Sequence, residues 1–159
     1  MYSRILVPMD GSEPSRQALQ EALKLARALN ASIRVLNVVD TWSLLTSEAT
    51  AASYGMLFEA LRSEGVQILK EAAETARLAG IVADTVLVEA PDVQVGECIV
   101  RKAREYQAEL ITCGTHGRRG LRRLLMGSDA EYIVRHAPVP VLLVRVPDAV
   151  ARADQPMKT

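Results

Sequence analysis

Aromatic side chains are scarce in this chain, at 4% of its 159 residues, and histidine and cysteine each occur only twice. With His116 and His136 as the only imidazoles, a histidine-based metal centre is not expected. Cys98 and Cys113 stand too far apart in sequence for a CxxC redox or zinc motif. This cysteine usage is typical of a reduced, cytoplasmic protein, and we expect that location.

An excess of charge of one sign is also absent, because 19 basic residues balance 19 acidic ones. A neutral balance gives no support for general binding to nucleic acid or to a membrane surface. No apolar run approaches the roughly 18 residues that a membrane span requires, and the first residues show no secretory signal pattern. We therefore expect no nucleic-acid partner and no membrane partner.

Several motifs that bind phosphate or carry out catalysis are missing. The sequence contains no GxxxxGK[ST] P-loop and no GxGxxG fingerprint after a strand. It also lacks a GxSxG elbow, and no nucleophile–base pair is evident. We therefore assign no catalytic residue from the sequence.

The chain is rich in apolar residues, at 49%, which is enough for one domain with a hydrophobic core. Compact apolar runs predict strands at 5–8, 33–39, 82–88, 110–113 and 139–146. Apolar residues at helical spacing predict helices at 14–29, 56–79, 95–106 and 128–135. The stretch 40–55 has no clean period and is interpreted as a loop with room for a short helix.

This alternation of strands and helices predicts an α/β fold, with a parallel sheet covered by helices on both faces. We expect one domain over 1–147 and a flexible tail over 148–159. Ligands of such sheets bind beyond the carboxyl ends of the strands, where the strand order reverses. If the first and fourth strands are neighbours there, Asp10 and Gly114 face each other across the crevice.

The segment 114–128 carries the strongest functional signal. Two residues separate Gly114 from Gly117, and nine separate Gly117 from the pair Gly127-Ser128. Glycines let the backbone approach a ligand closely, and the amides at the start of the following helix bind anions. The segment therefore predicts a phosphate site, and we expect the phosphate to belong to a nucleotide.

The same residues also have simpler interpretations, which stay open at this point. Asp10 either binds sugar hydroxyls or caps backbone N–H groups in the turn Asp-Gly-Ser. Gly114 and Gly117 either approach a ligand or only permit a turn from strand to helix. Gly127-Ser128 is either an ordinary helix start or an anion site, and one geometry serves both.

The polar residues between the glycines have two interpretations as well. His116 either contacts phosphate or is an exposed loop residue. Arg118 belongs to a group of arginines whose forked guanidinium groups suit phosphate. The alternative for at least two of the four is a solvated loop face. The group comprises Arg118, Arg119, Arg122 and Arg123.

The spacing Gly114-x2-Gly117-x9-Gly127-Ser128 resembles the ATP-binding pattern of universal stress proteins. The opening residues 5–12 and the closing residues 137–144 are similar to the same family, and the similarity covers about residues 3–146. The resemblance implies a Rossmann-like nucleotide-binding fold with five parallel strands in the order 3-2-1-4-5. It also implies that the nucleotide is ATP.

The resemblance further implies a role for individual positions. Asp10 would contact the ribose. The residues around the adenine would be Pro8, Met9, Val39 and Cys113. The residues that hold the phosphates would be Gly114, Gly117, Gly127, Ser128 and, through its backbone, Asp129. Family members of this type can carry magnesium or manganese on the phosphates, and no protein side chain is assigned as a metal ligand.

Two positions depart from the family pattern. Cys113 stands where methionine is usual, and a small adenine-side contact is compatible with it. Asp129 stands where a small apolar residue is common. A carboxylate beside the phosphates repels them unless it points away or meets a metal, so this departure bears on affinity rather than on the fold.

The resemblance also suggests a homodimer formed through the last predicted strand, residues 139–146. A long apolar edge strand is a pairing hazard unless it is covered. Antiparallel pairing with the same strand of a second subunit covers it in a two-fold contact. The alternative is a tail or helix of the same chain that lies over the edge.

Three functions follow from this interpretation of the sequence. The leading one is an ATP-binding regulatory module that acts on a protein partner in a stress response. The second is an enzyme, either a slow ATPase or a phosphoryl or nucleotidyl transferase. The third is a dimeric interaction protein that works without a nucleotide.

Overall fold

The computed structural model describes residues 1–41, 51–90, 93–115 and 126–146 of the chain. Within them, strands and helices alternate as the sequence predicts. The elements are β1 (Arg4–Pro8), α1 (Glu13–Leu29), β2 (Ser32–Val39), α3 (Ala51–Leu78), β3 (Ala83–Glu89), α4 (Val95–Tyr106), β4 (Leu110–Gly114), α5 (Ser128–His136) and β5 (Val141–Val144).

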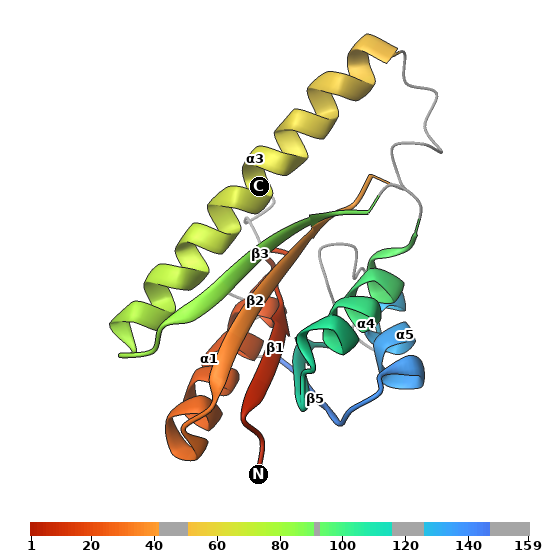
Figure 1. Ribbon diagram of the computed structural model, residues 1–159. Helices are drawn as coiled ribbons and strands as arrows, with labels where there is room; N and C mark the ends of the chain where they lie inside the picture. Colours follow the sequence, from red (N-terminus) through yellow and green to blue (C-terminus); the bar gives the residue numbers. More distant parts are fainter. Residues whose placement is uncertain (42–50, 91–92, 116–125, 147–159) are drawn as a thin grey trace, which may run out of the picture.

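The five strands form one parallel sheet in the order β3-β2-β1-β4-β5 (Figure 1). Leu6 of β1 pairs with Arg34 of β2 on one side and with Ile111 of β4 on the other. The chain runs outward from β1 to β3 and then returns to β4. The strand order therefore reverses between β1 and β4, and the implied order 3-2-1-4-5 is confirmed.

Helices cover both faces of the sheet, with α1 and α3 on one side and α4 and α5 on the other (Figure 1). Successive side chains of a strand point to opposite faces. Ile5 and Val7 accordingly join the core beneath α1 and α3, whereas Leu6 joins the core beneath α4 and α5. This two-sided burial explains why the strands appear in the sequence as compact apolar runs.

The first helix begins and ends where its local sequence directs. The Ser12 side chain accepts a hydrogen bond from the Ser15 amide, and Pro14 lies in the first turn, where a missing N–H does no harm. Asn30 ends α1 in the left-handed conformation, with φ 54°. The turn before the helix therefore lies at a fixed place just beyond β1.

Two predicted boundaries are wrong. Residues 51–55 belong to α3 and not to a loop, while 42–50 lie outside the described residues. The N-terminal part of α3 extends past the carboxyl ends of the strands (Figure 1), and Met56 there is 70% exposed. The first turns of α3 do not bury a continuous row of side chains against the sheet. They therefore need no apolar residues at helical spacing, and the sequence pattern gave no sign of a helix there.

The last strand is also shorter than predicted, because β5 covers Val141–Val144 and not 139–146. Pro140 has no N–H and contributes only its carbonyl, which accepts a hydrogen bond from the Ile111 amide at 3.1 Å. The edge that this strand offers for pairing is therefore short. The predicted tail, 148–159, lies outside the described residues.

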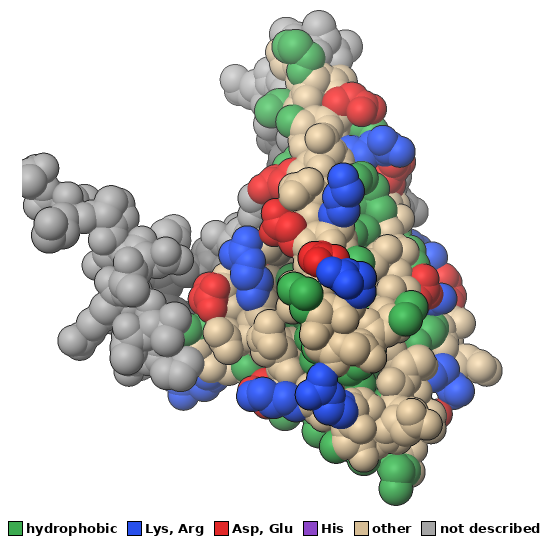
Figure 2. Space-filling model, turned by 90° about the vertical axis from the view of Figure 1, so that its left-hand side faces the viewer, with side chains coloured by type: hydrophobic (Ala, Val, Ile, Leu, Met, Phe, Trp, Pro, Cys, Tyr) green, Lys and Arg blue, Asp and Glu red, His purple; other side chains and the backbone are tan. Residues whose placement is uncertain are grey.

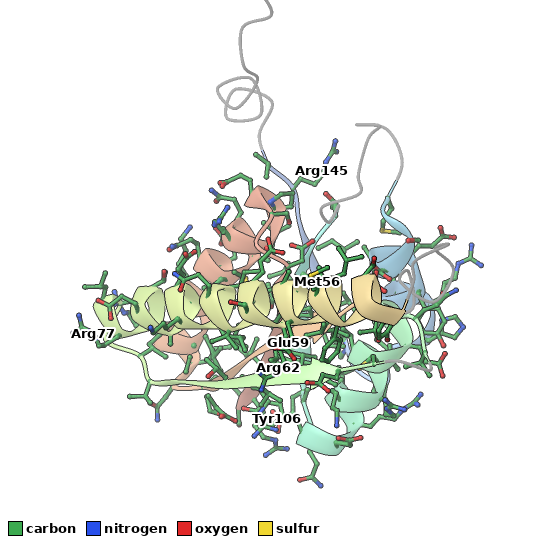
Figure 3. All side chains as sticks on the ribbon, turned by 90° about the horizontal axis from the view of Figure 1, so that it is seen from above. Met56, Glu59, Arg62, Arg77, Tyr106 and Arg145 are labelled. Carbon is green, nitrogen blue, oxygen red and sulfur yellow. The ribbon has the colours of Figure 1, made fainter. Side chains whose placement is uncertain are left out.

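One face of the molecule carries charges of both signs without segregation (Figure 2). Figure 2 shows acidic and basic side chains interspersed over one face of the molecule. Met56 and Arg77 lie towards opposite ends of α3 in Figure 3, and Arg62 lies beside β3, with its Nε 3.4 Å from Glu89 Oε1. No helix of the described residues is long and apolar enough to cross a bilayer.

Candidate functional site

A cavity of about 430 Å³ opens beyond the carboxyl ends of β1, β2 and β4. The cavity lies at the carboxyl ends of the strands, next to the place between β1 and β4 where the strand order reverses. Ligand binding is expected at such a place. Helices α3, α4 and α5 supply most of the remaining wall, and α1 adds Ser15. The lining residues are Pro8, Met9, Asp10, Ser15, Leu36, Asn37, Val38, Val39, Asp40, Leu61, Glu64, Gly65, Ile68, Val95, Ile99, Cys113, Gly114, Gly127, Ser128, Asp129, Ala130 and Ile133.

The structure brings together every predicted site residue that it describes. Nine of them line this one cavity: Pro8, Met9, Asp10, Val39, Cys113, Gly114, Gly127, Ser128 and Asp129. His116, Gly117 and Arg118 lie outside the described residues. Their roles, and nucleotide contact by the other nine, stay predictions.

Asp10 follows β1 directly and has a local structural role. Its Oδ1 accepts hydrogen bonds from the Ser12 amide at 3.0 Å and from the Ser12 hydroxyl at 2.5 Å. Gly11 between them has φ +80°, a conformation that glycine adopts without strain. The turn interpretation of Asp10 is therefore confirmed. Because Asp10 also lines the cavity, a ligand role remains compatible with this geometry.

Gly114, at the end of β4, is required by packing. A Cβ placed there would lie 2.6 Å from Pro14 Cβ and 2.8 Å from the Pro14 carbonyl carbon. Both distances are too short for real contacts, so glycine is what lets the end of β4 pass against the first turn of α1. This close approach brings the turn after β1 and the end of β4 to one side of the cavity.

Gly127 is the N-cap of α5 and carries no side chain that could cap the helix. Its own amide donates to the Thr115 carbonyl at 2.9 Å, which ties the start of α5 to the end of β4. The helix then begins at Ser128 beside the cavity. A helix N-terminus placed in this way favours a negatively charged group in front of it.

Asp129 has a partner that the sequence does not suggest. Its Oδ1 accepts a hydrogen bond from the Gly96 amide, 3.1 Å away in the first turn of α4. At least this oxygen is therefore directed towards α4.

The apolar part of the wall lies around the ends of β1, β2 and β4. Val39 and Cys113 are almost completely buried there, and burial raises the pKa of the Cys113 thiol to about 12. The thiol is therefore protonated at neutral pH and behaves as a small apolar surface. Cys98, the other free cysteine, is buried in α4, and its pKa is raised mainly by burial as well.

Sequence reasoning missed a polar residue in this wall, Asn37 of β2. Its side chain is 6% exposed, and its Nδ2 donates to the Met9 carbonyl at 2.8 Å. The Met9 amide donates to the Leu36 carbonyl at 2.8 Å, so β2 holds both backbone groups of the residue before Asp10. A lone asparagine within an apolar strand was the signal that could have identified it.

Two features of the α3, α4 and α5 walls were also missed. Gly65 lets α3 pack on Asn37, because a Cβ there would lie 2.4 Å from Asn37 Oδ1. Apolar residues from the three helices complete the wall, namely Leu61, Ile68, Val95, Ile99 and Ile133. Their helical spacing indicated burial but not which of them face a cavity.

The charge of the described wall is negative. Four carboxylates line the cavity, and no lysine, arginine or histidine does so among the residues that the structure describes: the carboxylates are Asp10, Asp40, Glu64 and Asp129. The same part of the chain holds no group of three or more potential metal ligands. The charge of an anionic ligand must therefore be balanced by backbone amides, by a cation that arrives with the ligand, or by residues outside the described part of the chain.

Comparison with known proteins identifies the class. Residues 1–145 match the model of the universal stress protein family, and the chain belongs to that family. It is 35% identical over 147 residues to the universal stress protein MJ0531 of Methanocaldococcus jannaschii, a match that covers 92% of this chain and 84% of that protein.

Solved structures agree with the fold. A universal stress protein family member from Burkholderia pseudomallei superposes with a TM-score of 0.72 at 33% identity, over 90% of this chain and 96% of that one. A universal stress protein solved in complex with cAMP superposes with a TM-score of 0.66 at 25% identity, over 90% of this chain and 97% of that one.

Proposed function

We propose that this chain binds an adenine nucleotide, ATP in particular, in the cavity between β1 and β4, and acts as a regulatory module of its family. The observation that carries the proposal is the convergence of nine predicted residues on one cavity at the reversal of strand order. Its volume, about 430 Å³, lies within the range of about 300–1,000 Å³ typical of small-molecule sites. The relative solved with cAMP supports a nucleotide of this class.

The wall fits the three parts of a nucleotide. The apolar surface of Pro8, Met9, Val39 and Cys113 suits a base, which gains from leaving water. The Asp10 carboxylate suits ribose hydroxyls, since a carboxylate oxygen can accept from several donors. Backbone amides at the start of α5 suit phosphate, because the N-cap Gly127 supplies no side chain to occupy them.

A divalent cation suits the same arrangement. The carboxylates of Asp10, Asp40 and Glu64 in the described wall oppose a bare triphosphate, and Mg²⁺ or Mn²⁺ bound to the phosphates removes much of the phosphate charge. The ion would arrive with the nucleotide, with the phosphates as its main ligands. His116, Gly117 and Arg118 complete the proposed phosphate contacts.

Calorimetric titration with Mg-ATP tests the proposal, using two variants that add the same charge. Ser128→Asp places a carboxylate at the first residue of α5, where it lies beside the cavity yet favours the helix. Ser63→Asp, on an exposed turn of α3 outside the cavity wall, is the matched control.

We expect wild type and Ser63→Asp to bind Mg-ATP equally, and Ser128→Asp to bind at least about tenfold more weakly, or about 1.4 kcal/mol. Absence of binding by wild type, or equal binding by Ser128→Asp, would refute the proposal. Mass spectrometry of ligand released from freshly purified protein provides an independent check on the identity of the nucleotide.

We further propose that the module acts as a homodimer with a protein partner. The dimer contact would be the edge of β5, which is apolar and pairs with β4 on one side only in the described residues. Bound nucleotide would change the surface near the cavity, and a partner would respond to that change.

A further inference from the structure

In the described residues, the N-cap of α4 does not cap the helix with its own side chain. Gln94, at the N-cap position, makes no side-chain hydrogen bond to the helix. The Gly96 amide instead donates to Asp129 Oδ1 at 3.1 Å, so a residue of α5 caps α4 from outside. A carboxylate suits this position, because a helix N-terminus carries partial positive charge.

The backbones of α4 and α5 also approach closely at this point. A Cβ at Gly96 would lie 2.9 Å from Tyr132 Cβ and 3.2 Å from the Asp129 carbonyl oxygen. The two helices can therefore meet here only because position 96 is glycine. The hydrogen bond and the packing together fix the start of α4 against the start of α5.

Both helices supply walls of the cavity next to this contact. Val95 and Ile99 contribute from α4, and Ala130 and Ile133 contribute from α5. A change in the contact between Gly96 and Asp129 would therefore alter the shape of the cavity beside the start of α5. It would also release a carboxylate oxygen beside the phosphates.

We propose that Asp129 is a positioning residue of the nucleotide cavity. Its carboxylate fixes α4 against α5, and its negative charge is taken up by the N-terminus of α4 instead of opposing the phosphates. This inference rests on the proposed nucleotide binding, but its first test needs no nucleotide.

The first test measures hydrogen exchange of the Gly96 amide by NMR in the ligand-free protein. Asp129→Ala removes the acceptor, Asp129→Asn keeps an acceptor oxygen without the charge, and Glu131→Gln removes a charge from the same turn. Glu131 pairs with Arg135 at 2.7 Å, whereas the Gly96 amide donates to Asp129, so Glu131 is the matched control.

We expect exchange at Gly96 to be about tenfold faster in Asp129→Ala, as for loss of a helix cap. Asp129→Asn should restore most of the protection, and Glu131→Gln should exchange like wild type. Unchanged exchange in Asp129→Ala would refute the cap and with it the proposal. Circular dichroism verifies that each variant is folded.

The second test compares AMP with Mg-ATP by calorimetry. A positioning role predicts that Asp129→Ala weakens both nucleotides by a similar factor, about five- to tenfold, and that Asp129→Asn weakens both by less. If the carboxylate instead opposed the phosphates, both variants would bind ATP more tightly than wild type does, with a smaller gain for AMP. That result would overturn the proposal.

The two tests separate this inference from the proposed function. If no variant and no wild-type protein binds a nucleotide, the proposed function fails, while the exchange data still report whether Asp129 caps α4. If wild type binds and the exchange at Gly96 is insensitive to Asp129, only the present inference fails.

Discussion

At the scale of single residues, Asn37 shows how one buried polar side chain can fix the position of a neighbouring site residue, here Asp10. Its amide holds the Met9 carbonyl, and Asp10 is the next residue along the chain. The β1–β2 pairing is thereby extended past the end of β1 by a side chain. A buried carbonyl without a partner is costly, so this contact restricts where the Asp10 turn can lie.

Replacing Asn37 with alanine should lower the free energy of unfolding by about 1–3 kcal/mol, because the buried Met9 carbonyl loses its side-chain donor. The control is Gln67→Ala, which removes an exposed amide that donates to Glu71 at 3.0 Å. That loss should change stability by less than about 0.5 kcal/mol. Urea denaturation measures both, and equal effects would contradict the role of Asn37.

The two buried thiols should be inert in the native protein. Burial raises the pKa of Cys113 to about 12 and also raises that of Cys98, and the thiolate is the reactive form. At pH 8 we expect a disulfide reagent such as DTNB to label neither thiol natively and both in urea. Rapid labelling of Cys113 in the native protein would show that the cavity exposes it.

The same shift has a defined effect on stability. The folded pKa of Cys113 is higher than its ordinary value of 9.0, so folding favours the protonated thiol. The contribution of the protonated Cys113 thiol to the free energy of unfolding is fully present below pH 9 and is lost as the pH rises towards about 12. Cys113→Ala should reduce the slope of unfolding free energy against pH in that interval.

At the scale of elements, α3 combines two kinds of helical turn. Its middle packs on β2 and β3, and the start extends past the ends of the strands (Figure 1). A glycine occurs in each part. Gly65 faces Asn37 and Leu87, whereas a Cβ at Gly55 would meet nothing within 4 Å. The same residue type therefore has opposite consequences along one helix.

Gly65→Ala and Gly55→Ala should change stability in opposite directions. The new Cβ at position 65 would lie 2.4 Å from Asn37 Oδ1 and 2.7 Å from Leu87 Cδ1, so we expect destabilisation by about 1–3 kcal/mol. At position 55 the better helix propensity of alanine should stabilise by about 0.5–1 kcal/mol. Chemical denaturation compares the two, and destabilisation of similar size in both would contradict this account.

At the scale of the whole molecule, the proposed dimer depends on the edge of β5. The Ile111 amide donates to the Pro140 carbonyl and the Thr115 amide to the Val144 carbonyl, so even-numbered residues bond to β4. Val141 and Leu143 consequently present their backbone groups to the outer edge. Four residues form a short edge, so a stable dimer needs side-chain contacts beside the strand.

Leu142→Lys should convert the proposed dimer to a monomer. Leu142 is 36% exposed on β5. In a two-fold dimer through this edge, a lysine at position 142 would lie close to the same lysine of the second subunit, and the two like charges would repel each other. The control is Val134→Lys on the exposed side of α5. Light scattering coupled to gel filtration should give a dimer for wild type and the control, and a monomer for Leu142→Lys. A wild-type monomer, or a dimer in Leu142→Lys, would exclude this interface.

Much of the fold could be predicted because local patterns agree with the tertiary structure. Ser12, Pro14 and Asn30 place α1, and apolar runs place the ends of the first four strands within one residue, whereas each end of β5 differs by two. The start of α3 could not be predicted, because a turn that does not pack on the sheet has no apolar period. The start of β5 depended on Pro140, which has no N–H to continue the pairing towards residue 139.

The candidate site could be predicted only in part. Its position followed from the parallel sheet, and Asp10, Gly114 and Gly127 lie at the cavity as expected. The reason for Gly114 was not predictable, because its close neighbour Pro14 lies 100 residues earlier in the chain. The direction of Asp129 towards Gly96 likewise depends on two helices that the sequence does not place relative to each other.

The sequence by itself determined the alternation of elements, the caps of α1, the family resemblance and the end of the sheet at which a ligand would bind. All of these depend on residues close together in the chain or on the chemistry of single side chains. The tertiary structure alone decided that Asn37 holds Met9, that Gly65 and Gly96 admit neighbouring elements, and that Asp129 caps α4. These contacts join residues distant in sequence, and their distances are set by how helices pack on the sheet, which no local pattern encodes.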